Sequence, residues 1–148
     1  MDCDIKLQAD QLLYDCGLYR ELSKYGNTCT IGSYYMDLMA RNDLDLYVDS
    51  DGICMDDIYV LVDHIIHTYK PVWFEAREGD EDGQAYWFVG FETMILGELW
   101  NVDIRFISNS DIQQAIAYND SIIEFVKSNK EAKETIVSIK NKLLKDKL

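Results

Sequence analysis

Two aspartates in the segment Asp43-Leu44-Asp45-Leu46 have the type and spacing that chemistry could use. In a β-strand, residues two apart project from the same face at a separation of about 7 Å, so both carboxylates face one way and both leucines the other. Like charges about 4 Å apart repel by about 4 kcal/mol at an effective dielectric constant of 20. A hard divalent cation removes this repulsion and prefers oxygen ligands. The pair therefore predicts a site for Mg²⁺ or Mn²⁺.

A glycine turn precedes these aspartates. Ile31-Gly32-Ser33 ends a short β-branched segment, and nine residues separate Ser33 from Asp43. Glycine lets the backbone N–H groups of a turn approach a phosphate closely, and the serine adds a hydroxyl donor. A phosphate-binding turn, a divalent cation and a carboxylate base are what in-line phosphoryl or nucleotidyl transfer requires.

A third carboxylate lies in the alternating segment 98–107. One face of this predicted strand is apolar and the other carries Asn101, Asp103 and Arg105. If the strand lies beside the strand 43–48, Asp103 joins the first two aspartates. Glu92 and Glu98 are the alternatives for this third acid.

The remaining pattern predicts the elements that position these residues. Helices are expected over 4–24, 55–69, 111–127 and 129–146, and strands over 28–31, 43–48, 72–76, 85–91 and 98–107. The acidic segment 78–83 is predicted to be an exposed hairpin loop, and Ser110 and Ser128 are predicted to cap the last two helices. We expect an α+β fold, a sheet covered by helices on one side. Residues 1–110 would form its core, and 111–148 a helical extension packed on the same domain.

Composition limits the class of protein. The chain has 148 residues, 48% of them apolar, and a net charge of −13, which fits one globular domain rather than a disordered acidic tail. The excess of carboxylates disfavours bulk nucleic acid as a partner. The C-terminal lysines are interpreted as the solvated face of the last helices. Without a long apolar stretch or a leader pattern, the chain is expected to be cytoplasmic and not to bind membranes.

These residues resemble the signature of the nucleotidyltransferase superfamily that includes DNA polymerase beta. That signature is a hydrophobic residue, Gly-Gly or Gly-Ser, a short spacer, and Asp-h-Asp-h, where h is hydrophobic. Gly32 to Leu38, together with Arg41, is similar to the Gly-Gly-Trp-x-x-Asp-x-Leu…Arg run of the small antibiotic nucleotidyltransferases, although Ser33 replaces the second glycine and the spacer is shorter. Those enzymes adenylylate a hydroxyl of lincosamides or aminoglycosides. The resemblance covers residues 28–48 well and 98–107 weakly.

The resemblance implies a mixed sheet of the nucleotidyltransferase type and a role for each matching residue. Gly32 and Ser33 would hold the triphosphate of an NTP, and Arg41 would contact a phosphate. Asp43 and Asp45 would bind two Mg²⁺ ions. Asp103 would complete the metal site and take the proton from the acceptor hydroxyl.

The predicted function is metal-dependent transfer of a nucleoside monophosphate (NMP) from an NTP to a hydroxyl of a small acceptor. The acidic surface favours a cationic, antibiotic-like acceptor. Two alternatives are a catalytically silent nucleotide- or protein-binding module of the same fold, and a transferase that modifies protein hydroxyls. The separation of Asp103 from the first two aspartates distinguishes the enzyme from the module. Tyr34, Tyr35 and Tyr47 flank the predicted site, where one could stack on a base, and the apolar C-terminal helices would allow a homodimer.

Overall fold

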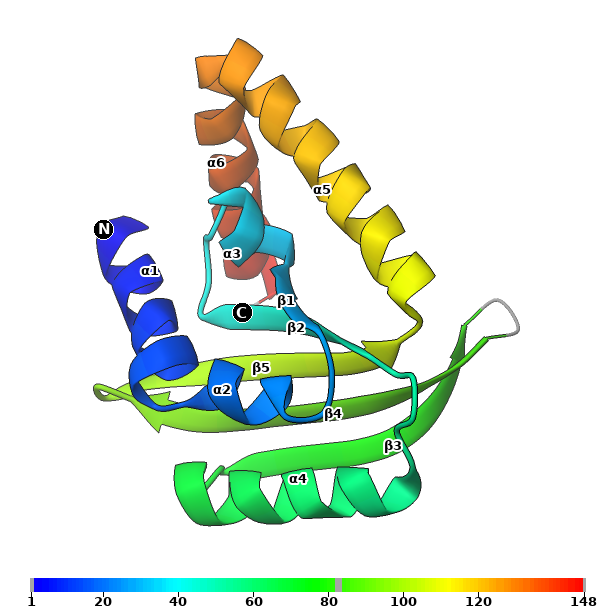
Figure 1. The fold of residues 1–148 in the computed structure, drawn as a ribbon. Coiled ribbons are helices and arrows are strands. Elements are labelled where there is room, and N and C mark those ends of the chain that lie inside the picture. The colour runs from blue at the N-terminus through cyan, green and yellow to red at the C-terminus, as the bar shows by residue number, and fades with distance from the viewer. Residues whose placement is uncertain (1, 82–83, 148) are drawn as a thin grey trace.

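A five-stranded mixed sheet forms the centre of the molecule. The structure, a computed structural model, describes residues 2–81 and 84–147. The strands are β1 (Thr28–Ile31), β2 (Asp43–Asp49), β3 (Trp73–Glu81), β4 (Gln84–Ile95) and β5 (Glu98–Ile107). Their spatial order is β1-β2-β5-β4-β3 (Figure 1). Only β2 and β5 pair in parallel among these neighbours, so the expected mixed sheet is confirmed.

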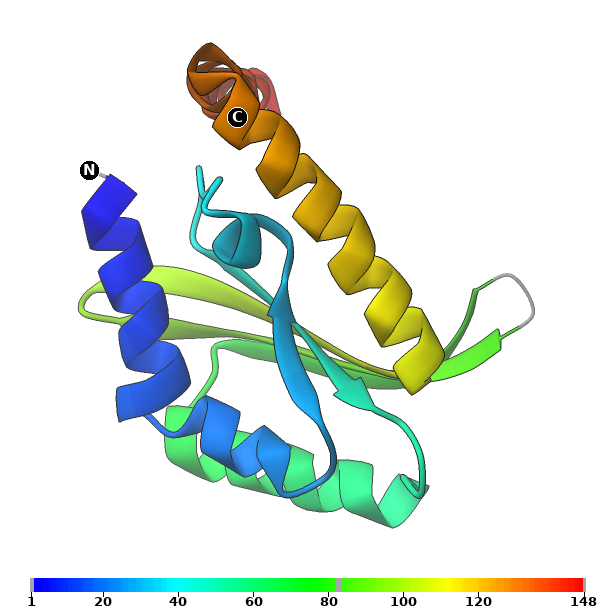
Figure 2. The ribbon, with the colours of Figure 1, turned by 45° about the horizontal axis from the view of Figure 1, so that its top comes forward.

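Helices lie over both faces of this sheet (Figure 2). One face is covered by α1 (Asp2–Asp10), the π-helical turn η1 (Gln11–Asp15), α2 (Leu18–Ser23) and α4 (Met55–Tyr69). The opposite side carries α3 (Gly32–Met36), α5 (Asn109–Ser128) and α6 (Lys130–Lys147), with α5 packed against β1 and β2. The α+β class is confirmed, and the expectation of helices on one side only is wrong. None of the helices in the described residues is long and apolar enough to cross a membrane.

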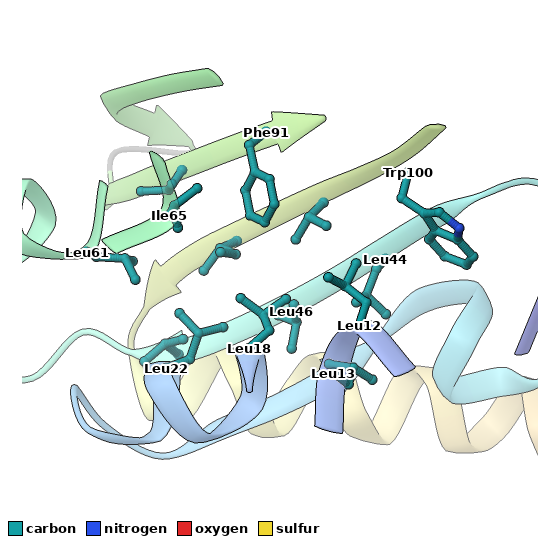
Figure 3. Close-up of a cluster of buried hydrophobic side chains, with 14 of the residues drawn as sticks. Leu12, Leu13, Leu18, Leu22, Leu44, Leu46, Leu61, Ile65, Phe91 and Trp100 are labelled. Carbon is teal, nitrogen blue, oxygen red and sulfur yellow. The ribbon is translucent and has the colours of Figure 1, made fainter. Parts of the chain in front are cut away.

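The hydrophobic core lies between the sheet and the first helix layer (Figure 3). Leu44 and Leu46 of β2, and Trp100 of β5, are completely buried there. They pack against Leu12, Leu13, Leu18, Leu22, Leu61 and Ile65. Burial of each large apolar side chain contributes about 1.5–3 kcal/mol. Because side chains alternate along a strand, this burial fixes the aspartates between the leucines on the opposite face.

The predicted helix 4–24 is interrupted. Gly17 has φ of 79°, a left-handed conformation that an α-helix does not contain, and it separates the π-helical turn from α2. The predicted apolar positions on either side of the break are nevertheless core residues, because Ala9 and Leu22 are both completely buried. The helix 55–69, by contrast, is confirmed with the same bounds as α4.

The predicted acidic loop 78–83 is largely strand. β3 continues to Glu81 and β4 begins at Gln84, while residues 82–83 lie outside the described residues. Gly79 pairs with Tyr86, and a side chain at position 79 would lie within 2.3–2.7 Å of the Tyr86 ring. The aromatic ring therefore covers the glycine and extends the ladder beyond the point at which composition alone predicts a turn.

Both C-terminal helices are confirmed, but their predicted caps are wrong. The side chain that caps α5 is Ser108, whose hydroxyl accepts a hydrogen bond from the N–H of Asp111, so Ser110 lies inside the helix. Ser128 is the last residue of α5, where its hydroxyl donates to the carbonyl of Glu124. Several serines near a helix end satisfy the same sequence pattern, and only the backbone path selects among them.

Candidate active site

Three aspartates lie on the sheet face opposite the core. Asp45 of β2 is the direct neighbour of Asp103 of β5, and Asp43 is the neighbour of Asn101. Adjacent strands are about 4.8 Å apart, and because β2 and β5 are neighbours, the condition under which Asp103 was expected to join the first two aspartates is met. Of the alternatives, Glu92 pairs with Asn101 from β4, on the same face.

This face presents residues in two cross-strand rows that differ in charge. The acidic row runs across β2, β5, β4 and β3 through Asp45, Asp103, Gly90 and Glu75. The basic–aromatic row is the next one along the strands and runs through Tyr47, Arg105, Phe88 and Arg77. Asp43 and Glu92 lie on the other side of the acidic row.

The predicted phosphate-binding turn lies directly beside the acidic row. Ile31 pairs with Asp45, and Gly32 follows with φ of 73°. A Cβ atom on Gly32 would lie 2.9 Å from Oδ2 of Asp45, so both the conformation and the available space require glycine. Gly32 is also the first residue of the short helix α3, and Asp37, which follows the last helical residue Met36, has a left-handed conformation. The turn and the carboxylates therefore form one constellation.

A buried asparagine of α5 supports this turn. The N–H of Gly32 donates to Oδ1 of Asn119 at 2.9 Å, and Nδ2 of Asn119 donates to the carbonyl of Ala115 at 2.9 Å. Only 6% of Asn119 is exposed. The first N–H group of the turn is thus already used within the protein, and Asn119 positions the turn rather than contacting a ligand.

A lysine of α6 also reaches the turn. Nζ of Lys140 donates to Oγ of Ser33 and, at 3.2 Å, to the carbonyl of Leu38. Burial lowers the pKa of Lys140, while Asp45 and Asp43 act in the opposite direction. The interpretation of the C-terminal lysines as a solvated face is therefore wrong for Lys140. Sequence analysis missed both Lys140 and Asn119, because 107 and 87 residues separate them from Ser33 and Gly32.

The site is arranged so that negative charge is costly. Burial, followed by the neighbouring charges of Asp103 and Asp43, raises the pKa of Asp45 to about 6. Arg105 and Lys140 lower it, but by less. Burial also raises the pKa of Asp43, against the effect of Arg41. Cations are therefore favoured at this position, as a metal site requires.

Arg41, which was expected to contact a phosphate, forms an ion pair with Asp43. Its Nε lies 2.7 Å from Oδ2 of Asp43, in an ion pair that is partly exposed. Both residues line a hollow of about 410 Å³, together with Asn42, Glu92, Leu99 and Asn101. Nδ2 of Asn42 donates to Oε2 of Glu98 at the exposed beginning of β5. Alternation along β5 places Glu98 on the side of Trp100 rather than on that of Asp103.

The tyrosines beside the turn anchor helices. The hydroxyl of Tyr34 donates to Asp10 of the first helix, and that of Tyr35 donates to Asp120 of α5 at 2.6 Å. Burial is the main cause that raises the pKa of Tyr34. Tyr47 belongs to the basic–aromatic row. The first two tyrosines therefore hold α3 in place, which does not favour a role in stacking on a base.

The donor set suits Mg²⁺, although the side chains are not arranged around a common point. No group of three or more His, Cys, Asp or Glu residues in ranges 2–81 and 84–147 has metal-binding geometry. Asp45 turns its Oδ2 toward Gly32, whereas Oδ1 of Asp103 lies 3.3 Å from where a Cβ of Gly90 would be. Carboxylate oxygens are the ligands that a hard cation prefers, so the residue types on these neighbouring strands fit Mg²⁺.

Comparison with known proteins gives the fold. No protein-family model and no curated protein sequence matches the chain. Among solved structures, the chain is similar to the Cid1 poly(U) polymerase with Mg and 3'-dATP bound, with a TM-score of 0.64 and 18% sequence identity. The chain has a nucleotidyltransferase fold. The match covers 95% of this chain but only 41% of the polymerase, so it extends to less than half of that protein.

Proposed function

We propose that the protein is a metal-dependent nucleotidyltransferase that moves an NMP from an NTP to an acceptor hydroxyl. The observation that carries the proposal is the Asp45–Asp103 register pair beside the Gly32–Ser33 turn. A nucleotidyltransferase fold supplies the general architecture, and this juxtaposition supplies the chemistry.

Each residue of the site has a proposed role. Asp43, Asp45 and Asp103 would hold Mg²⁺, which when bound neutralises negative charge on the triphosphate. Ser33 and Lys140 would bind the triphosphate, because the contact of Lys140 with the Ser33 hydroxyl places an ammonium group at the turn. Arg41 would exchange its ion pair with Asp43 for a phosphate.

The order of these groups across the sheet suits in-line displacement. The turn lies on the β1 side of β2, and Asp103 lies on the β5 side. The acceptor oxygen would attack the α-phosphorus and form a new P–O bond while the bond to the β-phosphate oxygen breaks. Pyrophosphate would leave toward Ser33, and the acceptor proton would pass to the Asp103 carboxylate.

Residues 111–148 would belong to the same functional unit as the core. Asn119 and Lys140 both contact the turn, so the helical extension contributes to the site instead of only covering it. The hydroxyl of a small, antibiotic-like acceptor remains a hypothesis. A homodimer also remains one, for which exposed Phe125 of α5 and Leu143 of α6 would supply apolar contacts.

A silent module of the same fold is favoured by one set of contacts. Arg41 pairs with Asp43, the N–H of Gly32 donates to Asn119, and Lys140 donates to Ser33. A site whose polar groups are satisfied internally is also what a non-catalytic descendant would retain.

Calorimetric titration with a non-hydrolysable ATP analogue, with and without Mg²⁺, tests the proposal. The native chain should bind the analogue in a Mg²⁺-dependent manner, and Asp43→Asn/Asp45→Asn should lose this binding. The control is Asp56→Asn/Asp63→Asn, which removes two exposed carboxylates from α4 on the other side of the sheet.

Binding that needs no metal and survives Asp43→Asn/Asp45→Asn would favour the silent module. No binding of any NTP analogue to the native chain would reject the proposed function. Mg²⁺-dependent binding would justify a screen for acceptors, with release of pyrophosphate as the readout.

A further inference from the structure

The basic–aromatic row contains two arginines stacked on one phenylalanine. The guanidinium carbons of Arg77 and Arg105 lie 4.9 Å and 5.0 Å from the centroid of the Phe88 ring. Phe88 is only 6% exposed. Cations from the strands on both sides therefore stack on this ring, and the two guanidinium groups share one aromatic support.

The two arginines differ in their remaining partners. Nε of Arg77 donates to Oε1 of Glu75 at 2.6 Å. Arg105 forms no ion pair with any residue in the described part of the chain. Stacking uses the flat face of a guanidinium and leaves its N–H groups, which lie in the plane, able to bind an anion in bidentate fashion. The charge of Arg105 acts on Asp45, whose pKa it lowers, but no acidic residue of the described ranges lies within ion-pair distance of it. Its N–H groups are therefore not engaged by a carboxylate of these ranges.

The position of the row relates it to the acceptor. Arg105 follows Asp103 by two residues on the same strand and face, so their Cα atoms are about 7 Å apart. In the proposed reaction, pyrophosphate leaves on the β1 side, and in-line geometry requires the acceptor to approach from the side of β5, β4 and β3. Arg105, Phe88 and Arg77 lie on these three strands.

We propose that Arg105 and Arg77 bind a phosphate group of the acceptor and thereby place its hydroxyl at Asp103. The inference rests on the proposed function and names the class of its second substrate, a hydroxyl compound that carries a phosphate near the reacting oxygen. It replaces the cationic acceptor that the net charge of −13 favours. Two guanidinium groups repel an ammonium group, and only the local charge acts at such short range.

The distribution of arginine supports this choice. The chain has four arginines, and three of them, Arg41, Arg77 and Arg105, lie at or beside the acidic sheet face. Planar, bidentate recognition of phosphate is the use for which arginine is better suited than lysine. Stacking on Phe88 fixes the geometry in advance and lowers the entropy cost of binding.

The test is direct binding, measured by calorimetry in the absence of NTP. The probes are a short oligoribonucleotide and glycerol 3-phosphate, which present a phosphodiester and a phosphate monoester beside hydroxyl groups, and glycerol as the uncharged counterpart. Arg105→Gln should weaken binding of the phosphate-bearing probe roughly tenfold or more. Arg77→Gln should weaken it less, since Glu75 already occupies Arg77. Arg20→Gln, which removes an exposed charge from α2 on the other side of the sheet, should have no effect.

The outcomes separate this inference from the proposed function. Binding of the oligoribonucleotide alone or of glycerol 3-phosphate alone supports the site and identifies the source of the phosphate. Equal affinity for glycerol 3-phosphate and glycerol, combined with no binding of the oligoribonucleotide, overturns it. The inference is also overturned if Arg105→Gln and Arg77→Gln both bind the phosphate-bearing probe as tightly as the native chain does. Loss of NTP binding in Asp43→Asn/Asp45→Asn is measured separately and can fail or succeed without affecting either result.

Discussion

The acidic row and the basic–aromatic row lie side by side on one sheet face, yet they are built on different principles. In the acidic row, Asp45 and Asp103 are neighbours with the same charge, and burial makes the ionisation of Asp45 costly. In the basic–aromatic row, like charges are also close, but the Phe88 ring lies between Arg105 and Arg77 and attracts both. The first arrangement requires a cation from outside, whereas the second is supported from within.

This difference shows why net charge is a poor guide to the ligand of a site. The chain carries 27 acidic and 14 basic residues, but the charge changes sign between two rows of one sheet. Because residues two apart on a strand share a face, Asp103 and Arg105 of β5 place opposite charges on the same face of the sheet. A substrate that spans both rows would contact the proposed metal-binding row and the proposed anion-binding row, which are two residues apart along each strand.

Removal of the Asp103 carboxylate should have the largest effect on the acidic row. Asp103→Asn should lower kcat by roughly 10²–10⁴-fold, the usual contribution of a general base and metal ligand. Mg²⁺-dependent NTP binding should change much less, because Asp43 and Asp45 remain. The measurement pairs a pyrophosphate-release assay with calorimetry.

Glu92→Gln is the matched control for this change. Glu92 lies on the same face of β4, and it competes with Asp103 as the third acid in the sequence pattern. If Glu92→Gln abolished turnover and Asp103→Asn did not, the two residues would have to exchange roles.

The pH dependence of stability should separate the acidic row from the rest of the molecule. The pKa of Asp45 is raised in the folded chain from 3.8 to about 6, so the native state holds its proton longer than the unfolded state does. Without metal, stability therefore falls as pH rises from about 4 to about 6, by about 2 kcal/mol after allowance for solvent screening. Asp45→Asn removes this loss. The free energy of unfolding of Asp45→Asn minus that of the native chain should be near zero at pH 4 and about 2 kcal/mol at pH 8.

Urea unfolding at several pH values measures this difference, with Asp56→Asn, which removes an exposed carboxylate of α4, as the control. The rise of about 2 kcal/mol between pH 4 and pH 8 that is expected for Asp45→Asn should be absent in Asp56→Asn. Addition of Mg²⁺ at pH 8 should stabilise the native chain and not Asp45→Asn. A flat difference between native and Asp45→Asn would mean that the acidic row is not strained in the folded chain.

The strand part of the site could be predicted from the sequence, and the helix part could not. Asp43, Asp45 and Asp103 follow from alternation, because Leu44 and Val102 identify the buried face whatever the partner strand is. The convergence of Asp103 with the other two aspartates needed one assumption, that β5 lies beside β2, and the order of the strands in the sheet satisfies it. Local patterns were sufficient because each residue is positioned by its own strand.

Asn119 and Lys140 carry no comparable local signal. An asparagine and a lysine on amphipathic helices are normally solvated, and what makes these two different is the packing of α5 and α6 against α3. The Arg105–Phe88–Arg77 stack also depends on cross-strand register. The predicted strand 72–76 ended before Arg77, so the sequence pattern did not place Arg77 opposite Phe88. Long-range geometry is therefore the information that the sequence alone lacked.

Gly90 is the position at which the two rows can be forced into conflict. A Cβ atom there would lie 2.9 Å from Cε1 and Cζ of Phe88 and 3.3 Å from Oδ1 of Asp103. Gly90→Ala should therefore displace both the aromatic ring and the carboxylate, lowering the free energy of unfolding by about 1–2 kcal/mol and kcat roughly tenfold. Gly79→Ala is the matched control, because its Cβ would also overlap an aromatic ring, that of Tyr86, but no atom of Asp103. Both variants should be destabilised in urea, and only Gly90→Ala should lose turnover beyond its loss of folded protein. Equal turnover per folded molecule in the two variants would show that the basic–aromatic row and the acidic row act independently, because the ring could then move without disturbing the carboxylate beside it.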